Sequence, residues 1–353
     1  ADNQSGLFYL PNLILAVSPN ISYRTIEWLV VLHVFIAGAG MYFAASHHYK
    51  SKDIRPPLVA ALAFQFSSVF ITHIGNLNII ASASYLPWAW LCTLRLRDTQ
   101  TLTAASILTV PLSLSIFSGH AQMSLIVCLP IFIYSVWQLK VTKTKLKWFG
   151  LISYTAALTI GMSAVFVFPS IEMSQYTHRA SYTYVEASRF SIPIEGLAGM
   201  FSPLLFGRGA EHFWPGWDRV ELGFAGLTTL FLAILGTRMK TLRTPLLLIA
   251  TTGVVVAIGN ATPMHRLFYD YIPGFSLLRV PARFILLTNF SVSMLACAGL
   301  HYWQNNTISN KHIWKYLLTA TIVVIIALTA AWTVATQKYP NPNSSTLAIA
   351  VII

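Results

Sequence analysis

The sequence predicts an all-α fold, a polytopic transmembrane helical bundle of about 10–11 spans that forms a single integral membrane domain over residues 1–353. Two observations lead to this prediction. Hydrophobic residues make up 55% of the chain and charged residues only 10%, whereas charged residues make up about 25% of a typical soluble domain. Apolar runs of about 20 residues, long enough to cross a bilayer as a helix, also recur along the chain.

The apolar runs give the expected elements in order. We place spans at about 26–46, 57–73, 77–94, 102–117, 121–139, 147–169, 221–236, 244–259, 284–304 and 313–337, and a further span starts near 346. The first residues carry no signal-peptide pattern, and the chain stops inside an apolar run. These two ends predict a fragment of a longer membrane protein.

Basic residues alternate along the loops, and this alternation predicts the orientation of the spans. Most of the 23 Lys and Arg residues lie in five short loops, each separated from the next by two spans: 47–56, 95–101, 140–147, 237–243 and 305–315. Because short basic loops stay in the cytoplasm, the long loop 170–220 and the second loop 260–283 are expected to be extracytoplasmic. The positive charge of the chain therefore indicates topology rather than nucleic-acid binding.

The two predicted extracytoplasmic loops contain arginine and no lysine. A guanidinium is planar and donates two parallel hydrogen bonds, so it suits phosphate and carboxylate better than an ammonium group does. The sequence therefore predicts phosphate binding, although pairing with Glu and Asp to order the loops is an equal alternative. Arg279 and Arg283 flank a proline just before a span, where they could form a phosphate cradle near the lipid headgroups, and the long loop adds Arg179 and Arg189.

One carboxylate of the long loop suits general-base chemistry. Glu172 lies just past Pro169, where a predicted span leaves the membrane. A nearby low-dielectric region raises the pKa of a carboxylate and suits it for general-base work. The structural alternative is a salt bridge from Glu172 to an arginine of the same loop. The other carboxylates there cannot be ranked by spacing, and two of them could hold a divalent metal, although no ligand spacing supports one: Glu186, Glu195, Glu211 and Asp218.

A histidine and two tryptophans complete the candidate site. His120 and Gln122 follow Gly119 at a predicted turn between helices, on the same face as the long loop, and Gln122 is expected to bind the substrate or its phosphate together with the arginines. A histidine at a helix boundary is more often a cap than a catalytic group, so this alternative stays open. Trp214 and Trp217 in the long loop could stack on sugar rings, but aromatic rings also anchor proteins at the headgroup level.

Several short motifs, taken together in their order and spacing, resemble the bacterial YfhO-like membrane protein family over nearly the whole chain. They include Leu7-Phe8-Tyr9, Leu32-His33, Pro87-Trp88, Gly119-His120-Ala121-Gln122, Pro169 with Glu172, Ser188-Arg189, Glu221-Leu222-Gly223 and Arg279-Val280-Pro281-Ala282-Arg283-Phe284. The resemblance implies a GT-C-like glycosyltransferase of the hexosyltransferase class in the bacterial cytoplasmic (inner) membrane, with its active face extracytoplasmic. It also implies that this fragment lacks the N-terminal span, the start of the first loop with the usual catalytic carboxylate, and the C-terminal part.

The resemblance also implies the partners. The donor would be a polyprenyl-phosphate-linked sugar, and the acceptor an envelope glycan or a teichoic-acid-like polymer. Within the fragment we expect Glu172 as the acid-residue candidate and His120 as a positioning or proton-sharing group, with arginines stabilising the leaving phosphate. No cofactor is expected with certainty.

Two other classes of function remain open. A transporter or flippase for a lipid-linked glycan would need ionisable residues at mid-membrane depth, and His33 and His301 are the deeper polar candidates. Charges gather instead at the outer rim, which favours an interfacial enzyme. A non-catalytic membrane scaffold is the third class.

Overall fold

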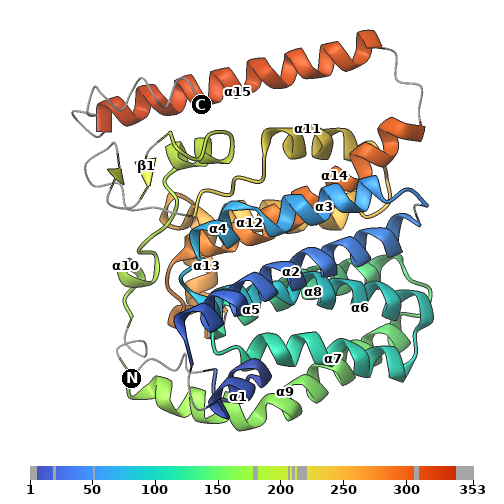
Figure 1. Ribbon diagram of the computed structural model, residues 1–353, viewed down its shortest axis with the longest axis vertical. Coiled ribbons are helices and arrows are strands. Elements are labelled where there is room, and N and C mark those ends of the chain that lie inside the picture. Colours follow the sequence, from blue (N-terminus) through green and yellow to red (C-terminus); the bar gives the residue numbers. More distant parts are fainter. Residues whose placement is uncertain are drawn as a thin grey trace.

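The computed structural model describes residues 6–18, 21–50, 52–177, 182–205, 207–208, 211–212, 221–272, 274–305 and 310–338, and these residues are mainly helical (Figure 1). Apart from the two-residue antiparallel pair of β1 (Gly207–Arg208) and β2 (Glu211–His212), the described elements are helices. The α-helices are α1 (Leu10–Ala16), α2 (Tyr23–Tyr49), α3 (Arg55–Gln65), α4 (Ser68–Thr72), α5 (Leu77–Ser84), α6 (Leu86–Thr99), α7 (Leu102–Phe117), α8 (Ala121–Val141), α9 (Lys145–Gln175), α10 (Tyr184–Ala187), α11 (Leu227–Gly236), α12 (Arg243–Ala257), α13 (Pro263–Tyr271), α14 (Ile285–Asn305) and α15 (Asn310–Lys338).

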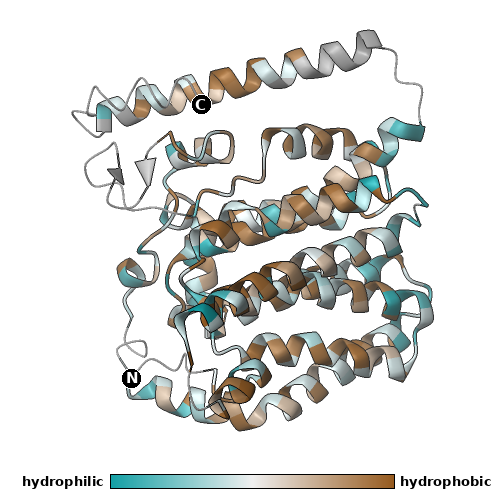
Figure 2. Ribbon diagram, viewed as in Figure 1, coloured by the Kyte–Doolittle hydropathy of each residue, from teal (hydrophilic) through white to brown (hydrophobic). Residues whose placement is uncertain are grey.

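Several of these helices have the length and composition of membrane spans, so the fold is that of a multi-pass membrane protein. Within the described residues, 5 helical segments qualify by length and hydropathy: α2, α5 with α6, α8, α9, and residues 281–305, which include α14. The remaining predicted spans correspond to shorter helices or to helix pairs. Figure 2 shows that hydrophobic residues predominate along the helices, and many large hydrophobic side chains are exposed, such as Phe35 of α2 and Phe132 of α8, as expected where helices face lipid.

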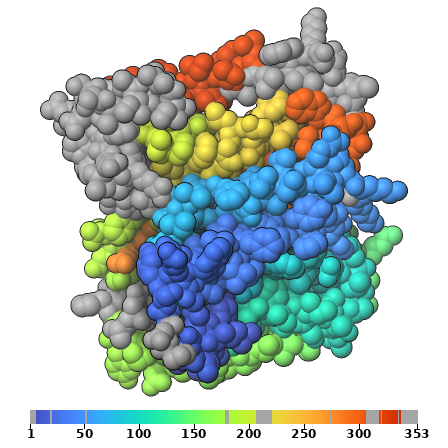
Figure 3. Space-filling view, viewed as in Figure 1, coloured from blue at the N-terminus to red at the C-terminus, as the bar shows by residue number. Residues whose placement is uncertain are grey.

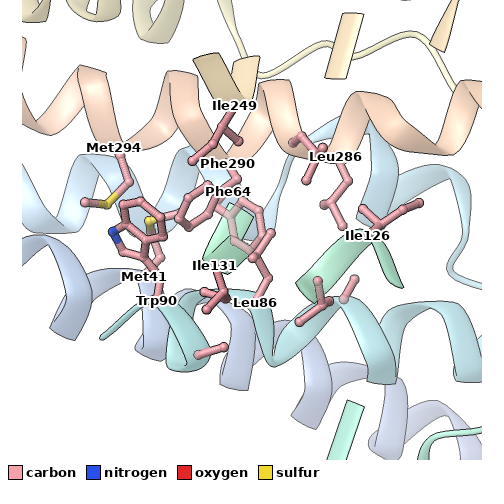
Figure 4. Packing of buried hydrophobic residues seen from close by; sticks show 14 of the residues in the cluster. Met41, Phe64, Leu86, Trp90, Ile126, Ile131, Ile249, Leu286, Phe290 and Met294 are labelled. Carbon is pink, nitrogen blue, oxygen red and sulfur yellow. The ribbon is translucent and has the colours of Figure 1, made fainter. Parts of the chain in front are cut away.

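The centre of the bundle is a buried aromatic and aliphatic core. Helix α14 packs against α11, α12 and α3, and α2 connects α3 to α5 and α6. Trp90 of α6 is fully buried, with its ring 5.3 Å from Phe290 of α14, and Phe64 of α3 lies 6.0 Å from the same phenylalanine (Figure 4). On the face shown in Figure 3, α2 and α3 lie between the α6–α8 region and the α11–α14 region. These contacts join the two halves of the sequence into one body.

Glycine allows the closest helix crossing. A Cβ atom on Gly299 of α14 would lie 1.8 Å from the carbonyl oxygen of Leu232, and one on Gly236 of α11 would lie 2.0 Å from that of Leu295. Two backbones can approach this closely only where side chains are absent, as is common between helices in membranes.

The predicted spans correspond in order to helical segments, of which 5 have the length and hydropathy of membrane spans, and the span predicted to start near 346 lies outside the described residues. Three of the predicted spans are not continuous helices. Span 57–73 breaks at Phe66 and Ser67, where the freed backbone N–H of Ser68 donates to the carbonyl of Phe224 at 2.7 Å. Span 77–94 breaks at Tyr85, because Pro87 starts a new helix rather than continuing the old one. The predicted span 221–236 is wrong at its start. Residues 221–226 are not helical, since Gly223 and Gly226 have positive φ angles of 73° and 97°.

The basic loops gather at one end of the bundle, which we call the basic end (right in Figure 1). His47 contacts Asp98 at 2.9 Å, and Thr144 donates to Gln100 at 2.8 Å, so three of the five loops meet there. The opposite end, which we call the loop-rich end, carries residues 73–76, 118–120 and 258–284. Loops that are basic in the sequence thus lie at one end of the bundle, and the loops between them lie at the other end.

Candidate functional site

The first candidate residue is held by the start of a helix at the loop-rich end. His120 is the N-cap of α8, and its Nδ1 accepts a hydrogen bond from the backbone N–H of Met123 at 3.1 Å. Gly119 has a φ of 87°, which allows the sharp reversal between α7 and α8. His120 is only 3% exposed. The predicted capping role is therefore confirmed, and it fixes the orientation of the imidazole ring.

Gln122, the second residue of α8, connects this helix start to the second loop. Its Nε2 donates to the carbonyl oxygen of Val280 at 3.1 Å, and its Oε1 accepts from Nη1 of Arg283 at 3.2 Å. Gln122 is buried, so both groups have lost water and depend on these bonds. One side chain thereby joins two parts of the chain that are far apart in sequence.

Arg283 also approaches the histidine, and the three side chains form what we call the His120–Gln122–Arg283 cluster. Nη1 of Arg283 lies 3.3 Å from Nε2 of His120. Because Nδ1 of His120 accepts from the backbone, the neutral ring carries its proton on Nε2. A guanidinium also only donates. Two N–H donors therefore lie side by side, and an anionic oxygen can accept from both.

The turn that carries Arg283 is strained. Val280 has a φ of 62°, in the left-handed region that β-branched residues rarely adopt. Such a conformation costs about 1–3 kcal/mol and persists where its surroundings hold it. The carbonyl of Val280 accepts from Gln122 and from the backbone N–H of Arg283 at 3.2 Å, and its side chain is buried. The turn leaves Arg279 exposed and Arg283 half-buried.

The segment that carries Arg189 packs against this turn. The N–H of Ile192 donates to the carbonyl of Ala257 at 2.8 Å. A Cβ atom on Gly259 would lie 1.8 Å from Oγ of Ser191 and 3.4 Å from Cγ of Pro281, so the side chains of both neighbouring segments pack on this glycine. Arg189 itself is exposed, with its guanidinium 5.0 Å from the ring centre of Phe190. The segments of Arg189, Arg279 and Arg283 therefore share one region.

An aromatic cluster completes the loop-rich end. Tyr184 lies 5.7 Å from His265 and 5.5 Å from Tyr269, measured between ring centres, and the hydroxyl of Tyr269 donates to the carbonyl of Tyr182 at 2.6 Å. Burial lowers the pKa of His265 to about 4, so this histidine is neutral at physiological pH. The cluster joins the long loop to α13.

The structure does not bring every predicted residue to this region. Glu172 is exposed on the last turn of α9, and among the described residues no hydrogen bond or ion pair connects it to the cluster. Glu186 forms a capping box with Thr183 at the start of α10, which is a structural role, and Glu195 is buried. The predicted residues Arg179, Trp214 and Trp217, and the side chains of Glu211 and Asp218, lie outside the described residues.

A second polar pair was not predicted from the sequence. Nε2 of His73 lies 3.3 Å from Oε1 of Glu221, and both side chains are 5% exposed. Nδ1 of His73 lies 3.0 Å from the carbonyl of Val69 and 3.1 Å from the hydroxyl of Thr72, so α4 holds the ring with its Nε2 facing the carboxylate. The sequence contains no signal that would predict a contact between two residues so far apart in the chain.

A third buried polar chain lies between α1, α2 and α5. The hydroxyl of Tyr85 is 2.7 Å from that of Tyr9, which in turn contacts Nε2 of His33, while Nδ1 of His33 donates to the carbonyl of Leu29 at 2.6 Å. Tyr9 and His33 are fully buried. In the part of the chain that the structure describes, no group of three or more His, Cys, Asp or Glu residues is arranged to hold a metal ion.

Comparison of the chain with protein-family models, with curated proteins and with solved structures finds no match. The properties available for a functional assignment are therefore those of the site itself: a half-buried arginine, a buried histidine whose Nε2 lies next to it, and two further arginines on neighbouring segments.

Proposed function

We propose that this protein is a membrane glycosyltransferase that transfers a sugar from a polyprenyl-phosphate donor to an envelope glycan or teichoic-acid-like acceptor. The observation that carries the proposal is the contact of Arg283 with His120 and Gln122. These residues belong to two of the motifs that resemble the YfhO-like family, and they meet although the sequence separates them widely. A GT-C-like bundle in a bacterial cytoplasmic membrane is part of the same proposal.

In the proposed reaction the protein acts mainly on the leaving group. An acceptor hydroxyl attacks the anomeric carbon and gives its proton to a base, while the bond between that carbon and the phosphate oxygen breaks. The electron pair stays on the polyprenyl phosphate. Arg283 and the Nε2–H of His120 donate to that phosphate, with Arg189 and Arg279 as further cationic ligands. Glu172 remains the proposed base in this chain, since it is an exposed carboxylate on the same side of the bundle.

The distribution of charge supports an extracytoplasmic site. Short loops rich in Lys and Arg remain in the cytoplasm, and the described loops of this kind meet at the basic end. The proposed site would then face the side where lipid-linked sugars are used for envelope assembly.

The test uses membranes that contain the full-length protein and a radiolabelled polyprenyl-phosphate-linked hexose. We expect the label to leave the lipid, and Arg283→Ala to slow this transfer by about 100-fold, the loss that follows removal of one donor from a charge-stabilising site. Arg266→Gln is the matched control, because Arg266 lies on α13 at the same end and pairs with Asp270 instead. Transfer that survives Arg283→Ala undiminished would exclude the phosphate role.

A flippase for a lipid-linked glycan is the second candidate, and the buried chain of Tyr85, Tyr9 and His33 favours it. Polar and ionisable groups inside a membrane bundle often mark a transport path. The same assay separates the two functions. Label that stays on the lipid but moves between leaflets, and does so more slowly in His33→Leu, would support the flippase.

A further inference from the structure

A shallow groove lies outside the proposed active region, at the start of α12. Its volume is about 620 Å³, and it is lined by Thr237, Arg243, Thr244, Leu247, Leu248 and Thr251. Gly236, at the end of α11, packs against Leu295 and Gly299 in the second half of α14, and residues 237–243 form one of the basic loops. The groove therefore belongs to the basic end, away from the His120–Gln122–Arg283 cluster.

The polar part of the groove suits an anion. Arg243 is half-buried, and its Nη1 donates to the carbonyl oxygen of Thr237 at 3.3 Å. A guanidinium has five N–H donors, and this is the one hydrogen bond that the described residues give it, so further donors can bind phosphate oxygens. The hydroxyl of Thr244 is exposed beside it, and exposed Arg238 and Lys240 add positive charge in the preceding turn.

The apolar part of the groove follows the same helix away from that charge. Leu247 and Leu248 are 41% and 47% exposed, which is high for leucines in contact with water but ordinary in contact with acyl chains. They lie one turn beyond Arg243, and Thr251 lies two turns beyond it, which is about 12 Å along the helix axis. Polarity thus falls from the membrane boundary towards the bilayer interior.

This order of groups is that of a phospholipid. We propose that the groove binds an anionic phospholipid of the surrounding bilayer, with its phosphate on Arg243 and its acyl chains along Leu247 and Leu248. The volume lies within the range of ligand pockets, about 300–1,000 Å³. A second hollow near Arg95 also combines an arginine with threonines, but its volume is only about 250 Å³. Basic grooves between helices on the cytoplasmic side commonly bind anionic headgroups.

The test is native mass spectrometry of the full-length protein in neutral detergent, titrated with phosphatidylglycerol or with phosphatidylcholine. We expect tighter binding of phosphatidylglycerol, and a loss of about fivefold in that affinity for Arg243→Gln. Lys145→Gln is the matched control, because Lys145 is an exposed cation at the same end and outside the groove. It should change the affinity by less than about twofold. The double variant Leu247→Trp with Leu248→Trp should also weaken binding, because it fills the groove without changing charge.

Three results would overturn the proposal. Equal losses in Arg243→Gln and Lys145→Gln would show attraction to net charge alone. Full binding by the double tryptophan variant would show that the acyl chains lie elsewhere. Displacement of phosphatidylglycerol by millimolar inorganic phosphate would show a site for free phosphate rather than for lipid. Because sugar transfer is not measured, these outcomes do not depend on the proposed glycosyltransferase activity.

Discussion

The two ends of the bundle use charge in different ways. At the basic end the described ion pairs include sequence neighbours in exposed positions, such as Asp53 with Arg55 and Arg97 with Asp98. The loop-rich end differs in having ionisable side chains that are buried or half-buried and contact distant segments, as His73 does with Glu221 and Arg283 does with Gln122. This difference shows that the number of basic residues in a loop indicates the orientation of the spans. A structural or chemical role of a charged residue is indicated instead by its burial and by its contacts with distant segments.

The strongest test of this comparison is the removal of one partner of a buried pair. Glu221→Gln should lower the free energy of unfolding by about 3 kcal/mol, because it disrupts a desolvated contact with His73. Arg55→Gln at the basic end should leave it nearly unchanged, because exposed ion pairs contribute little to stability. Thermal unfolding in detergent measures both. Equal losses in the two variants would contradict the contrast between the ends.

The second largest effect should be a loss of stability at the loop-rich end when the pH is lowered. The pKa of His265 falls from 6.5 to about 4 on folding, so the unfolded chain binds the proton more readily. The contribution of neutral His265 to the free energy of unfolding is therefore fully present above about pH 6.5. It is lost, by about 3 kcal/mol, as the pH drops towards 4, and it changes little below that value. Hydrogen exchange of α13 as a function of pH measures this. His265→Phe should remove the dependence, and a dependence that persists in this variant must come from another group.

The contact between α8 and the strained turn gives a smaller effect. Gln122→Leu leaves the carbonyl of Val280 without its side-chain donor and removes one acceptor from Arg283. We expect a loss of about 1–3 kcal/mol, concentrated in faster hydrogen exchange of residues 279–284. Gln100→Leu at the basic end removes an exposed bond to Thr144 and should cost less than about 0.5 kcal/mol. Uniform exchange in Gln122→Leu would argue against local strain.

The smallest expected effect is a gain in stability, and it comes from relieving a positive φ angle at the basic end. Lys50 has a φ of 47° as the C-cap of α2, a position that glycine adopts without strain. Lys50→Gly should therefore stabilise the protein by about 0.5–1 kcal/mol in thermal unfolding. A destabilised variant would show that the side chain of Lys50 has a role beyond topology.

The sequence predicted the fold because hydrophobic runs and basic loops depend on the bilayer, which acts on each span separately. It did not predict the breaks at Ser67 and Tyr85, because tertiary contacts such as the bond from Ser68 to Phe224 replace the helical ones there. For the site, residue type identified His120, Gln122 and Arg283, but their contacts arise from packing between distant helices.

Because a sequence does not show contacts between distant helices, one buried pair was missed and one predicted residue does not reach the His120–Gln122–Arg283 cluster. His73 and Glu221 form a pair only because α4 and residues 221–226 lie together in three dimensions. Glu172 was selected for its place next to a membrane boundary, yet α9 packs mainly on α7 and leaves the carboxylate exposed. Position along a span is visible in a sequence, whereas the neighbours across the bundle are not.

The measurement that tests the central claim most directly is sugar transfer from a radiolabelled polyprenyl-phosphate donor in membranes with Arg283→Lys and Arg55→Lys. Both substitutions keep the positive charge and hence the topology. Because lysine cannot reproduce the guanidinium fork, we predict that Arg283→Lys loses most of the transfer while Arg55→Lys retains it. Equal transfer by both variants would contradict the claim that Arg283 acts through specific contacts at the loop-rich end.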